Sequence, residues 1–173
     1  MTMNSAITSD VIVKCLKMYD DVQTPEYKTS GSSGCDIRAH FTDDFLTQYK
    51  RLYGGVNIND NATAIFIPPF NTIVIPTGIK VEIPYGYEIQ VRSRSGMAVD
   101  GVSVANGIGT IDSDYRGEIK VILTNSSDKM YKIYHGDRIA QLILSKVERM
   151  FLELTEQLTT THREDGGFGS TGK

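Results

Sequence analysis

Residues 80–92 read Lys-Val-Glu-Ile-Pro-Tyr-Gly-Tyr-Glu-Ile-Gln-Val-Arg, with polar and apolar side chains alternating on either side of Tyr85-Gly86-Tyr87. Alternation with a period of two places the apolar side chains on one face of a β-strand. A glycine-containing turn between two such segments is typical of a β-hairpin. The stretch therefore predicts two antiparallel strands, at 80–84 and 88–92.

Similar short segments recur along the chain. Further strands are predicted at 11–16, 64–67, 73–75, 117–123, 130–134 and 138–147, and prolines bound the second and third of these. Many short strands separated by Gly, Pro, Asn and Asp predict an all-β fold, as a sandwich, jelly roll or barrel.

One segment has a different period. Residues 43–53 carry apolar side chains at 45, 46, 49, 52 and 53, which fits a short amphipathic helix. Thr42 or Asp43 can cap its start, and Gly54-Gly55 can end it. Residues 56–62 are predicted to be a polar loop.

The overall composition limits the function. The chain of 173 residues fits one domain with a sizeable core. A net charge of −3 argues against nucleic acid as the main partner. No apolar stretch is long enough to span a membrane, and residues 1–10 lack the pattern of a secretory signal. A cytoplasmic protein is expected, or one of the host-cell cytoplasm or nucleus if it is viral.

The cysteines and histidines show no metal-binding pattern. Cys15 and Cys35 are too few for a disulfide framework and are expected to be small buried hydrophobes in a reducing compartment. His40, His135 and His162 are scattered, without ligand spacing.

The C-terminal residues 163–173 read Arg-Glu-Asp-Gly-Gly-Phe-Gly-Ser-Thr-Gly-Lys. Such a segment has too little apolar surface to fold alone. Its backbone N–H groups, hydroxyls and two cations are donors suited to phosphate, and Phe168 can stack on a base. We interpret it as an arm that orders over a nucleotide with several phosphates. The alternative is a frayed chain end.

Other segments carry groups suited to the same ligand. In Ser93-Arg94-Ser95-Gly96, the guanidinium and hydroxyl can donate to phosphate at the start of a short helix; the alternative is a charged turn. Gln141 in the segment 136–142 can project toward a phosphate, or face solvent as an ordinary strand residue. Asp36 in the segment 33–37 can accept from the water molecules of a hydrated Mg²⁺, or serve as a turn aspartate.

Residues 105–117 add groups for a base and for catalysis. An apolar hairpin with two glycines presents backbone N–H and C=O groups, and Asn106 adds an amide, so a pyrimidine edge can be read there. The Asp112 carboxylate can deprotonate a water for attack on phosphate, and Tyr115 can pack on a sugar. A turn-capping role is the alternative for Asp112.

Taken in order, these segments resemble the five motifs of the trimeric dUTP nucleotidohydrolases (dUTPases). The matching stretches are 34–37 (Gly-Cys-Asp-Ile), 94–98 (Arg-Ser-Gly-Met-Ala), 109–118 (Gly-Thr-Ile-Asp-Ser-Asp-Tyr-Arg-Gly-Glu), 136–142 (Gly-Asp-Arg-Ile-Ala-Gln-Leu), and Arg163 with 166–172. The resemblance covers nearly the whole chain and implies a jelly-roll-like β-sandwich in a homotrimer with shared active sites. Residues 1–150 would form the β domain, and 151–173 an arm that closes over another subunit's nucleotide.

The resemblance also implies a reaction and a site. dUTP would be hydrolysed to dUMP and pyrophosphate with Mg²⁺, which lowers dUTP and supplies dUMP for dTTP synthesis. Asp112 would activate the attacking water, and Asp36 would organise the Mg²⁺ that bridges the triphosphate. The substrate-binding residues would be Arg94, Ser95, Gly96, Asn106, Gly109, Thr110, Ile111, Tyr115, Gln141, Arg163, Phe168, Gly169, Ser170 and Thr171.

Three features depart from the family pattern. Glu164 and Asp165 follow Arg163 where the family has Gly, and two carboxylates there should weaken arm closure unless they point to solvent. Ser93 stands where Pro is common. Residues 42–62 are extra and are expected to form a surface loop, either a neutral insertion or a contact for a protein partner.

Two rival functions follow from the same residues. A dCTP deaminase would need a different second motif, typically Arg-Ser-Ser, whereas residues 94–96 are Arg-Ser-Gly. A binding module that keeps the dUTP pocket but acts through the 42–62 insert would not need Asp112. Pyrophosphate release from dUTP separates these alternatives.

Overall fold

The computed structural model describes residues 10–54, 57–59 and 62–167. Its strands are β1 (Lys14–Lys17), β2 (Cys35–Arg38), β3 (Asn57–Asn59), β4 (Ala62–Ile67), β5 (Thr72–Glu82), β6 (Tyr87–Arg92), β7 (Val102–Val104), β8 (Gly109–Ile111), β9 (Glu118–Asn125), β10 (Tyr131–Tyr134) and β11 (Arg138–Lys146). The helices are α1 (Asp43–Tyr53) and α2 (Ser95–Val99). Neither is long and apolar enough to cross a membrane.

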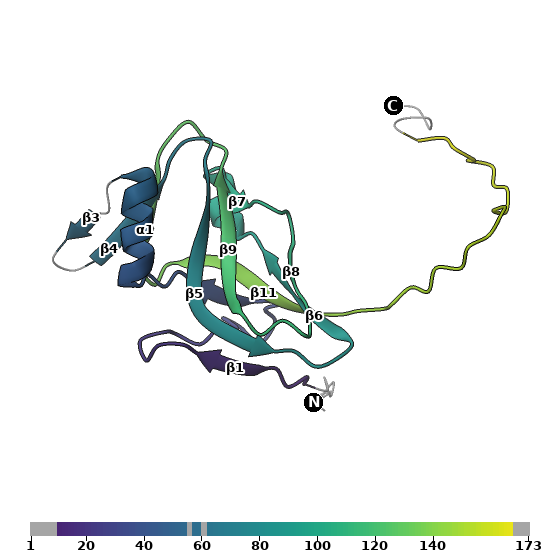
Figure 1. Cartoon of the computed structure of the whole chain (residues 1–173), viewed down its shortest axis with the longest axis horizontal. Helices are drawn as coiled ribbons and strands as arrows, with labels where there is room; N and C mark the ends of the chain where they lie inside the picture. Colours follow the sequence, from purple (N-terminus) through teal and green to yellow (C-terminus); the bar gives the residue numbers. More distant parts are fainter. Residues whose placement is uncertain (1–9, 55–56, 60–61, 168–173) are drawn as a thin grey trace, which may run out of the picture.

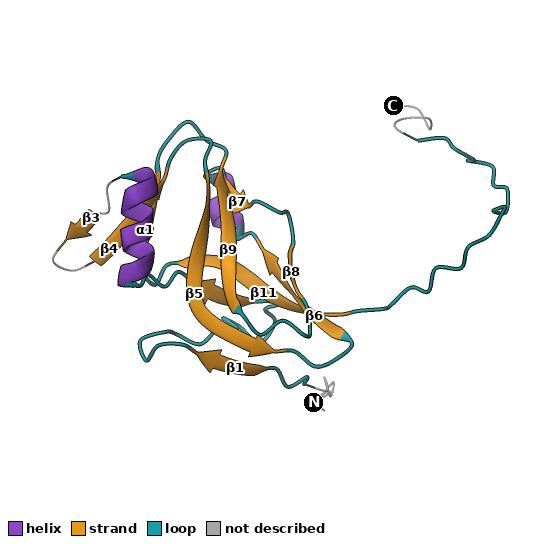
Figure 2. Cartoon of the chain, viewed as in Figure 1, coloured by secondary structure: helices purple, strands orange, loops and turns teal. Residues whose placement is uncertain are grey.

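Two four-stranded antiparallel sheets form the body of the molecule (Figures 1 and 2). Their strand orders are β1-β5-β9-β7 and β2-β11-β6-β8, and a smaller sheet, β10-β4-β3, adjoins α1. The core is built from Ile, Val and Leu on the inner faces, such as Ile75 and Val121 of the first sheet and Ile37 and Leu142 of the second. This architecture confirms the predicted all-β, jelly-roll-like sandwich.

The stretch 80–92 does not form the predicted hairpin. β5 pairs with β1 and β9, whereas β6 pairs with β11 and β8, so residues 84–87 carry the chain from one sheet to the other. Val81, Ile83, Ile89 and Val91 are all buried. Alternation requires only that each strand bury one face, and two sheets facing each other satisfy this as well as two neighbouring strands do.

Pro76 does not end a strand as predicted. β5 runs through it, and the register with β9 shifts just after it. A proline is tolerated at such a bulge because no ladder N–H is needed there. The Glu118 side chain accepts from the N–H of Thr77 at 3.1 Å and of Gly78 at 2.8 Å. Gly78 has a φ of 66°, a conformation that glycine adopts without strain.

Two further predictions at the edges were wrong. The first strand is Lys14–Lys17 instead of 11–16, and it is an edge strand whose residues are all exposed, including Cys15. Cys35 is only half-buried. Residues 57–59 form β3, paired with β4, in place of the predicted polar loop. In β3, pairing with a neighbouring strand prevails over the low β-propensity of asparagine.

Helix α1 has the predicted bounds but not the predicted surface-loop character. The Thr42 hydroxyl accepts from the N–H of Phe45 at 3.2 Å, and Gly54 ends the helix with a φ of 82°. Leu46 and Tyr49 are buried. The Tyr49 hydroxyl donates to the carbonyl of Phe66 and accepts from its N–H, so α1 is tied to β4.

Replacing Tyr49 with Phe should destabilise the protein by about 1–3 kcal/mol, because it leaves two buried backbone groups of Phe66 without a partner. The midpoint of urea unfolding would measure this. Tyr53→Phe is the matched control: Tyr53 is more exposed and makes only a long bond to Thr72, of 3.4 Å. Equal stability losses in the two variants would contradict the role assigned to Tyr49.

Candidate functional site

Asp36, Arg94 and Arg138 form an ion-pair network, called here the arginine cluster. Oδ1 of Asp36 accepts from Nε of Arg94 at 3.0 Å, and Oδ2 accepts from Nη1 of Arg138 at 2.9 Å. Both arginines line a cavity of about 210 Å³ that also contains Tyr131. Burial raises the pKa of Tyr131 above its ordinary value. The first, second and fourth motifs thus meet at one place.

Close packing brings these motifs together. A Cβ atom on Gly34 would lie 3.0 Å from Ile143 and 3.2 Å from Oε1 of Gln141, so only glycine permits this approach of the chain to β11. The Gln141 amide donates to the carbonyl of Ser93 at 3.2 Å. The Ser93 hydroxyl accepts from the N–H of Val104 at 2.8 Å, which gives this departure from the family pattern a structural role. Ser95 and Gly96 open helix α2, as the predicted short helix requires.

Asp112 lies in a different cleft. This cleft has a volume of about 690 Å³ and is lined by Tyr85, Gly86, Tyr87, Glu88, Asp112, Ser113, Asp114, Val147, Glu148 and Arg149. Asp112 is exposed, and its carbonyl accepts from the N–H of Tyr115 at 3.2 Å. The Tyr115 hydroxyl donates to the carbonyl of Glu118 at 3.0 Å. A side chain on Gly117 would overlap that hydroxyl, so the glycine makes room for Tyr115.

The turn at 105–108 is not the predicted hairpin. It joins β7 in the first sheet to β8 in the second, so the two strands do not pair with each other. Asn106 is exposed, and Gly107 has a φ of 70°. A Cβ on Gly109 would lie 3.2 Å from Val91, which explains a small residue at this position. Thr110 and Ile111 continue β8 toward Asp112.

The sheet register separates Asp112 from the arginine cluster. Asp36 and Arg92 both pair with Gln141, whereas Ile111, which precedes Asp112, pairs with Ile89. From β2 to β8 is three strand spacings, roughly 14 Å, and from Arg92 to Ile89 is roughly 10 Å along β6. One chain therefore does not bring its Asp112 to its own Arg94.

After β11 the chain leaves the body as an extended strand-like segment (Figure 1), which we call the C-terminal strap, residues 147–167. Met150, Phe151, Leu152, Leu154 and Leu158 on it are 78–99% exposed. Five large apolar side chains in so short a segment form the kind of surface that another protein chain covers. Phe168, Gly169, Ser170 and Thr171 lie outside the described residues.

Glu164 has a defined place in a turn of the strap. Its φ is 45°, which is the region that glycine favours, and the related motif has glycine at this position. Its carboxylate accepts from the N–H of Thr161 at 2.8 Å. The Arg163 side chain donates to the carbonyl of Gly166 at 2.7 Å. The Glu164 carboxylate thus caps the turn, and in this conformation it does not lie beside the Arg163 guanidinium as an ion pair.

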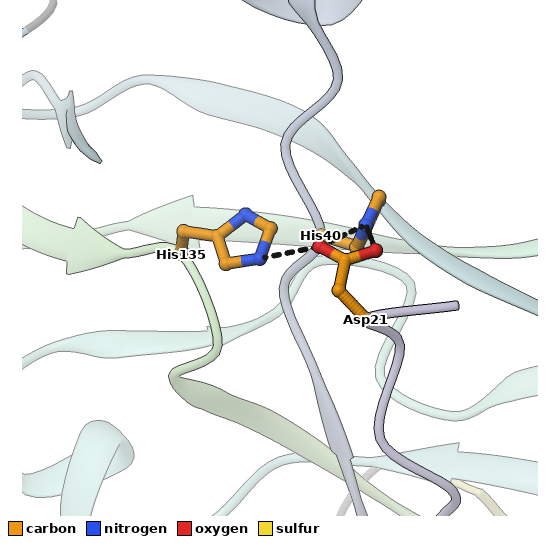
Figure 3. Close-up of side chains that lie close together, drawn as sticks. All are labelled: Asp21, His40 and His135. Atoms are coloured by element: carbon orange, nitrogen blue, oxygen red, sulfur yellow. Dashed lines mark hydrogen bonds and ion pairs between the residues drawn. The ribbon is translucent and has the colours of Figure 1, made fainter. Parts of the chain in front are cut away.

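Sequence spacing missed a cluster of Asp21, His40 and His135 (Figure 3). Nε2 of His40 lies 3.1 Å from Asp21 Oδ1, and Nε2 of His135 lies 3.6 Å from Asp21 Oδ2. The three ligand atoms lie within 4.8 Å of one another, a spacing that a metal ion could bridge. The three residues are far apart in sequence, so only the fold reveals the cluster.

Hydrogen bonding in this cluster does not suit a metal. Nδ1 of His135 accepts from the N–H of Phe41 at 3.0 Å, so in the neutral ring the proton sits on Nε2, the atom that would ligate. Nδ1 of His40 is buried and has no partner in the described part of the chain. Metal-binding histidines normally donate their second N–H to an acceptor. We therefore interpret the cluster as a hydrogen-bonded junction.

The fold and the five ordered motifs define a jelly-roll protein of the nucleotidohydrolase class. The family model for dUTPase matches residues 57–172. The deoxyuridine 5'-triphosphate nucleotidohydrolase of Chlamydia muridarum (strain MoPn / Nigg) is 46% identical over 159 residues, covering 91% of this chain and 96% of that protein. The Fusobacterium nucleatum enzyme of the same name is 43% identical over 155 residues, covering 89% and 92%. The chain belongs to the dUTPase family.

Solved structures agree on the fold. The Staphylococcus bacteriophage 80alpha dUTPase, in a structure with dUpNHpp, has a TM-score of 0.72 and covers 94% of this chain and 99% of its own at 21% identity. The dUTPase from phage phi11 of S. aureus has a TM-score of 0.66 at 19% identity, covering 87% and 99%.

Acid should weaken the protein through the histidine junction. Burial and the nearby His40 lower the pKa of His135 below its ordinary 6.5. As pH falls through 6.5 toward that lower value, the unfolded chain binds a proton that the folded chain does not, so stability is lost. The hydrogen bond from His40 lowers the pKa of Asp21 below 3.8, so its stabilisation persists above 3.8 and is lost as pH falls through the lowered value.

We expect the melting temperature to fall between pH 7.5 and 5.5, and to fall less in His135→Gln, whose amide can still accept from Phe41. His162→Gln, on the exposed strap, is the control and should follow the wild type. An unchanged pH dependence in His135→Gln would contradict this assignment.

Proposed function

We propose that the protein hydrolyses dUTP to dUMP and pyrophosphate at active sites shared between copies of the chain. The observation that carries the proposal is family membership over about nine-tenths of the chain with the third motif, including Asp112 and Tyr115, intact. Lowering dUTP and supplying dUMP for dTTP synthesis would follow from the reaction.

Arg94, Ser95 and Gln141 would bind the triphosphate. Triphosphate hydrolysis depends mainly on positioning and charge neutralisation, with little covalent chemistry by the protein. Arg94 is held by the carboxylate of Asp36, so its orientation is fixed before a nucleotide arrives. Gly96 would allow close approach of the phosphates to the backbone, since nothing lies within 4 Å of the position of an added Cβ.

Asp112 would accept a proton from the attacking water, which needs an accessible carboxylate. Its position in an open cleft meets that need. Asn106 and the backbone of Gly109, Thr110 and Ile111 would read the uracil edge. Tyr115, fixed by its bond to Glu118, would lie against the deoxyribose and disfavour a 2′-hydroxyl by contact.

Mg²⁺ would be held mainly by the triphosphate, as this ion usually keeps water ligands and binds through few carboxylates. Asp36 fits an indirect role: each of its oxygens accepts one guanidinium bond and retains a lone pair for a metal-bound water. The ion would neutralise charge on the phosphates. Asp36 would also orient Arg94.

A homotrimer with shared sites is part of the proposal. The distance between Asp112 and the arginine cluster within one chain calls for a second copy, and the exposed apolar side chains of the strap call for a surface to cover them. Residues 1–150 would form the β domain and 151–173 the arm over a neighbouring site. Arg163, Phe168, Gly169, Ser170 and Thr171 would then contact the nucleotide.

The test is pyrophosphate release from dUTP, dCTP, dTTP and UTP with Mg²⁺, for wild type and Asp112→Asn. We expect release from dUTP only, reduced by about 10²-fold or more in the variant because the general base is lost. Omitting Mg²⁺ should lower the rate. Binding of dUTP without turnover would reject the hydrolase and favour a nucleotide-binding module, whereas activity on dCTP would indicate the deaminase branch.

A further inference from the structure

The carboxylate of Asp36 is divided between two arginines from different elements. Arg94 at the start of α2 bonds to Oδ1, and Arg138 at the start of β11 bonds to Oδ2. The exposed fraction of the Asp36 side chain is 16%, so both ion pairs are shielded from water. A single arginine commonly takes both oxygens of a carboxylate with its forked donors. Here Arg138 occupies the oxygen that such a pairing with Arg94 would need.

Arg94 keeps donors for an anion in this arrangement. Its Nε–H is used by Asp36, and Nη1 donates to the carbonyl of Arg138 at 3.2 Å. Among the described residues, none accepts from Nη2 of Arg94. In a two-oxygen pairing with Asp36, Nη2 would be the second donor, because Nε and Nη2 form one edge of the guanidinium fork.

We propose that Arg138 is a positioning residue for triphosphate binding. By holding Oδ2 of Asp36, it keeps Nη2 of Arg94 available to the phosphates. It also keeps the cluster cationic: two arginines and one aspartate give +1 + 1 − 1, a net charge of +1. The inference rests on the proposed function and extends it to a residue whose side chain need not touch the nucleotide.

Binding measured without catalysis tests this role. A non-hydrolysable dUTP analogue and deoxyuridine would be titrated in EDTA against wild type, Arg138→Gln, Arg138→Lys and Arg51→Gln. Arg51, exposed in the last turn of α1, provides the same chemical change away from the cluster. Arg138→Gln should weaken analogue binding about tenfold or more and leave deoxyuridine binding unchanged. Arg138→Lys restores the charge and should recover part of the loss, and Arg51→Gln should match wild type.

A double variant separates positioning from direct contact. Adding Asp36→Asn to Arg138→Gln returns the net charge to +1 and removes the carboxylate that would capture Arg94. If Arg138 acts through Asp36, the double variant binds the analogue more tightly than Arg138→Gln alone. If Arg138 binds phosphate itself, the loss persists in the double variant, and the inference is overturned.

Other outcomes also decide the matter. Equal weakening of analogue and deoxyuridine binding in Arg138→Gln would assign Arg138 a purely structural role and overturn the proposal. If Arg138→Gln fails to fold, Arg138→Lys still tests it: the lysine variant must bind the analogue more weakly than wild type with deoxyuridine binding unchanged. If the wild type binds no analogue, the proposed function itself fails; if it binds and Arg138→Gln binds equally well, only this inference fails.

Discussion

The register of the sheet β2-β11-β6-β8 determines where the charged groups of the candidate site lie. Gln141 pairs with Asp36 on one side and Arg92 on the other, while β8 pairs further along β6. A slip of one residue would turn each of these side chains to the opposite face. The buried residues that alternate with them, such as Ala140 and Leu142, resist such a slip because it would expose them to water. The core thereby fixes the distance between Asp112 and the arginine cluster.

Several polar side chains maintain the irregular parts of this frame. Glu118 satisfies two backbone N–H groups at the β5 bulge, and the buried Asn125 side chain donates to the carbonyls of Ile67, Pro68 and Lys129. The junction of Asp21 with His40 and His135 joins the N-terminal segment to the ends of β2 and β10. These groups use hydrogen bonds where the sheets cannot supply them. They act on the geometry of the site without belonging to it.

The sequence predicted which segments are strands better than which strands pair. The bounds of α1 and of β9 and β11 were close, because capping residues and alternation are local signals. The 80–92 hairpin was wrong, since two facing sheets give the same pattern as a hairpin. Motif order identified the family and placed Asp36, Arg94 and Gln141 together. It gave no role to Arg138 and did not group Asp21 with His40 and His135, because these contacts join residues 19 to 114 positions apart, and nothing local encodes them.

The central claim is that a complete active site takes Asp112 from one chain and Arg94 from another. Mixing two inactive variants, Asp112→Asn and Arg94→Gln, after joint refolding tests it directly. If the site is shared, chains reassorted at random place both intact residues together in about a quarter of the sites, and dUTP hydrolysis returns to a corresponding fraction of wild type. If Asp112 and Arg94 serve the same site from one chain, no mixed site is intact, and the mixture remains inactive.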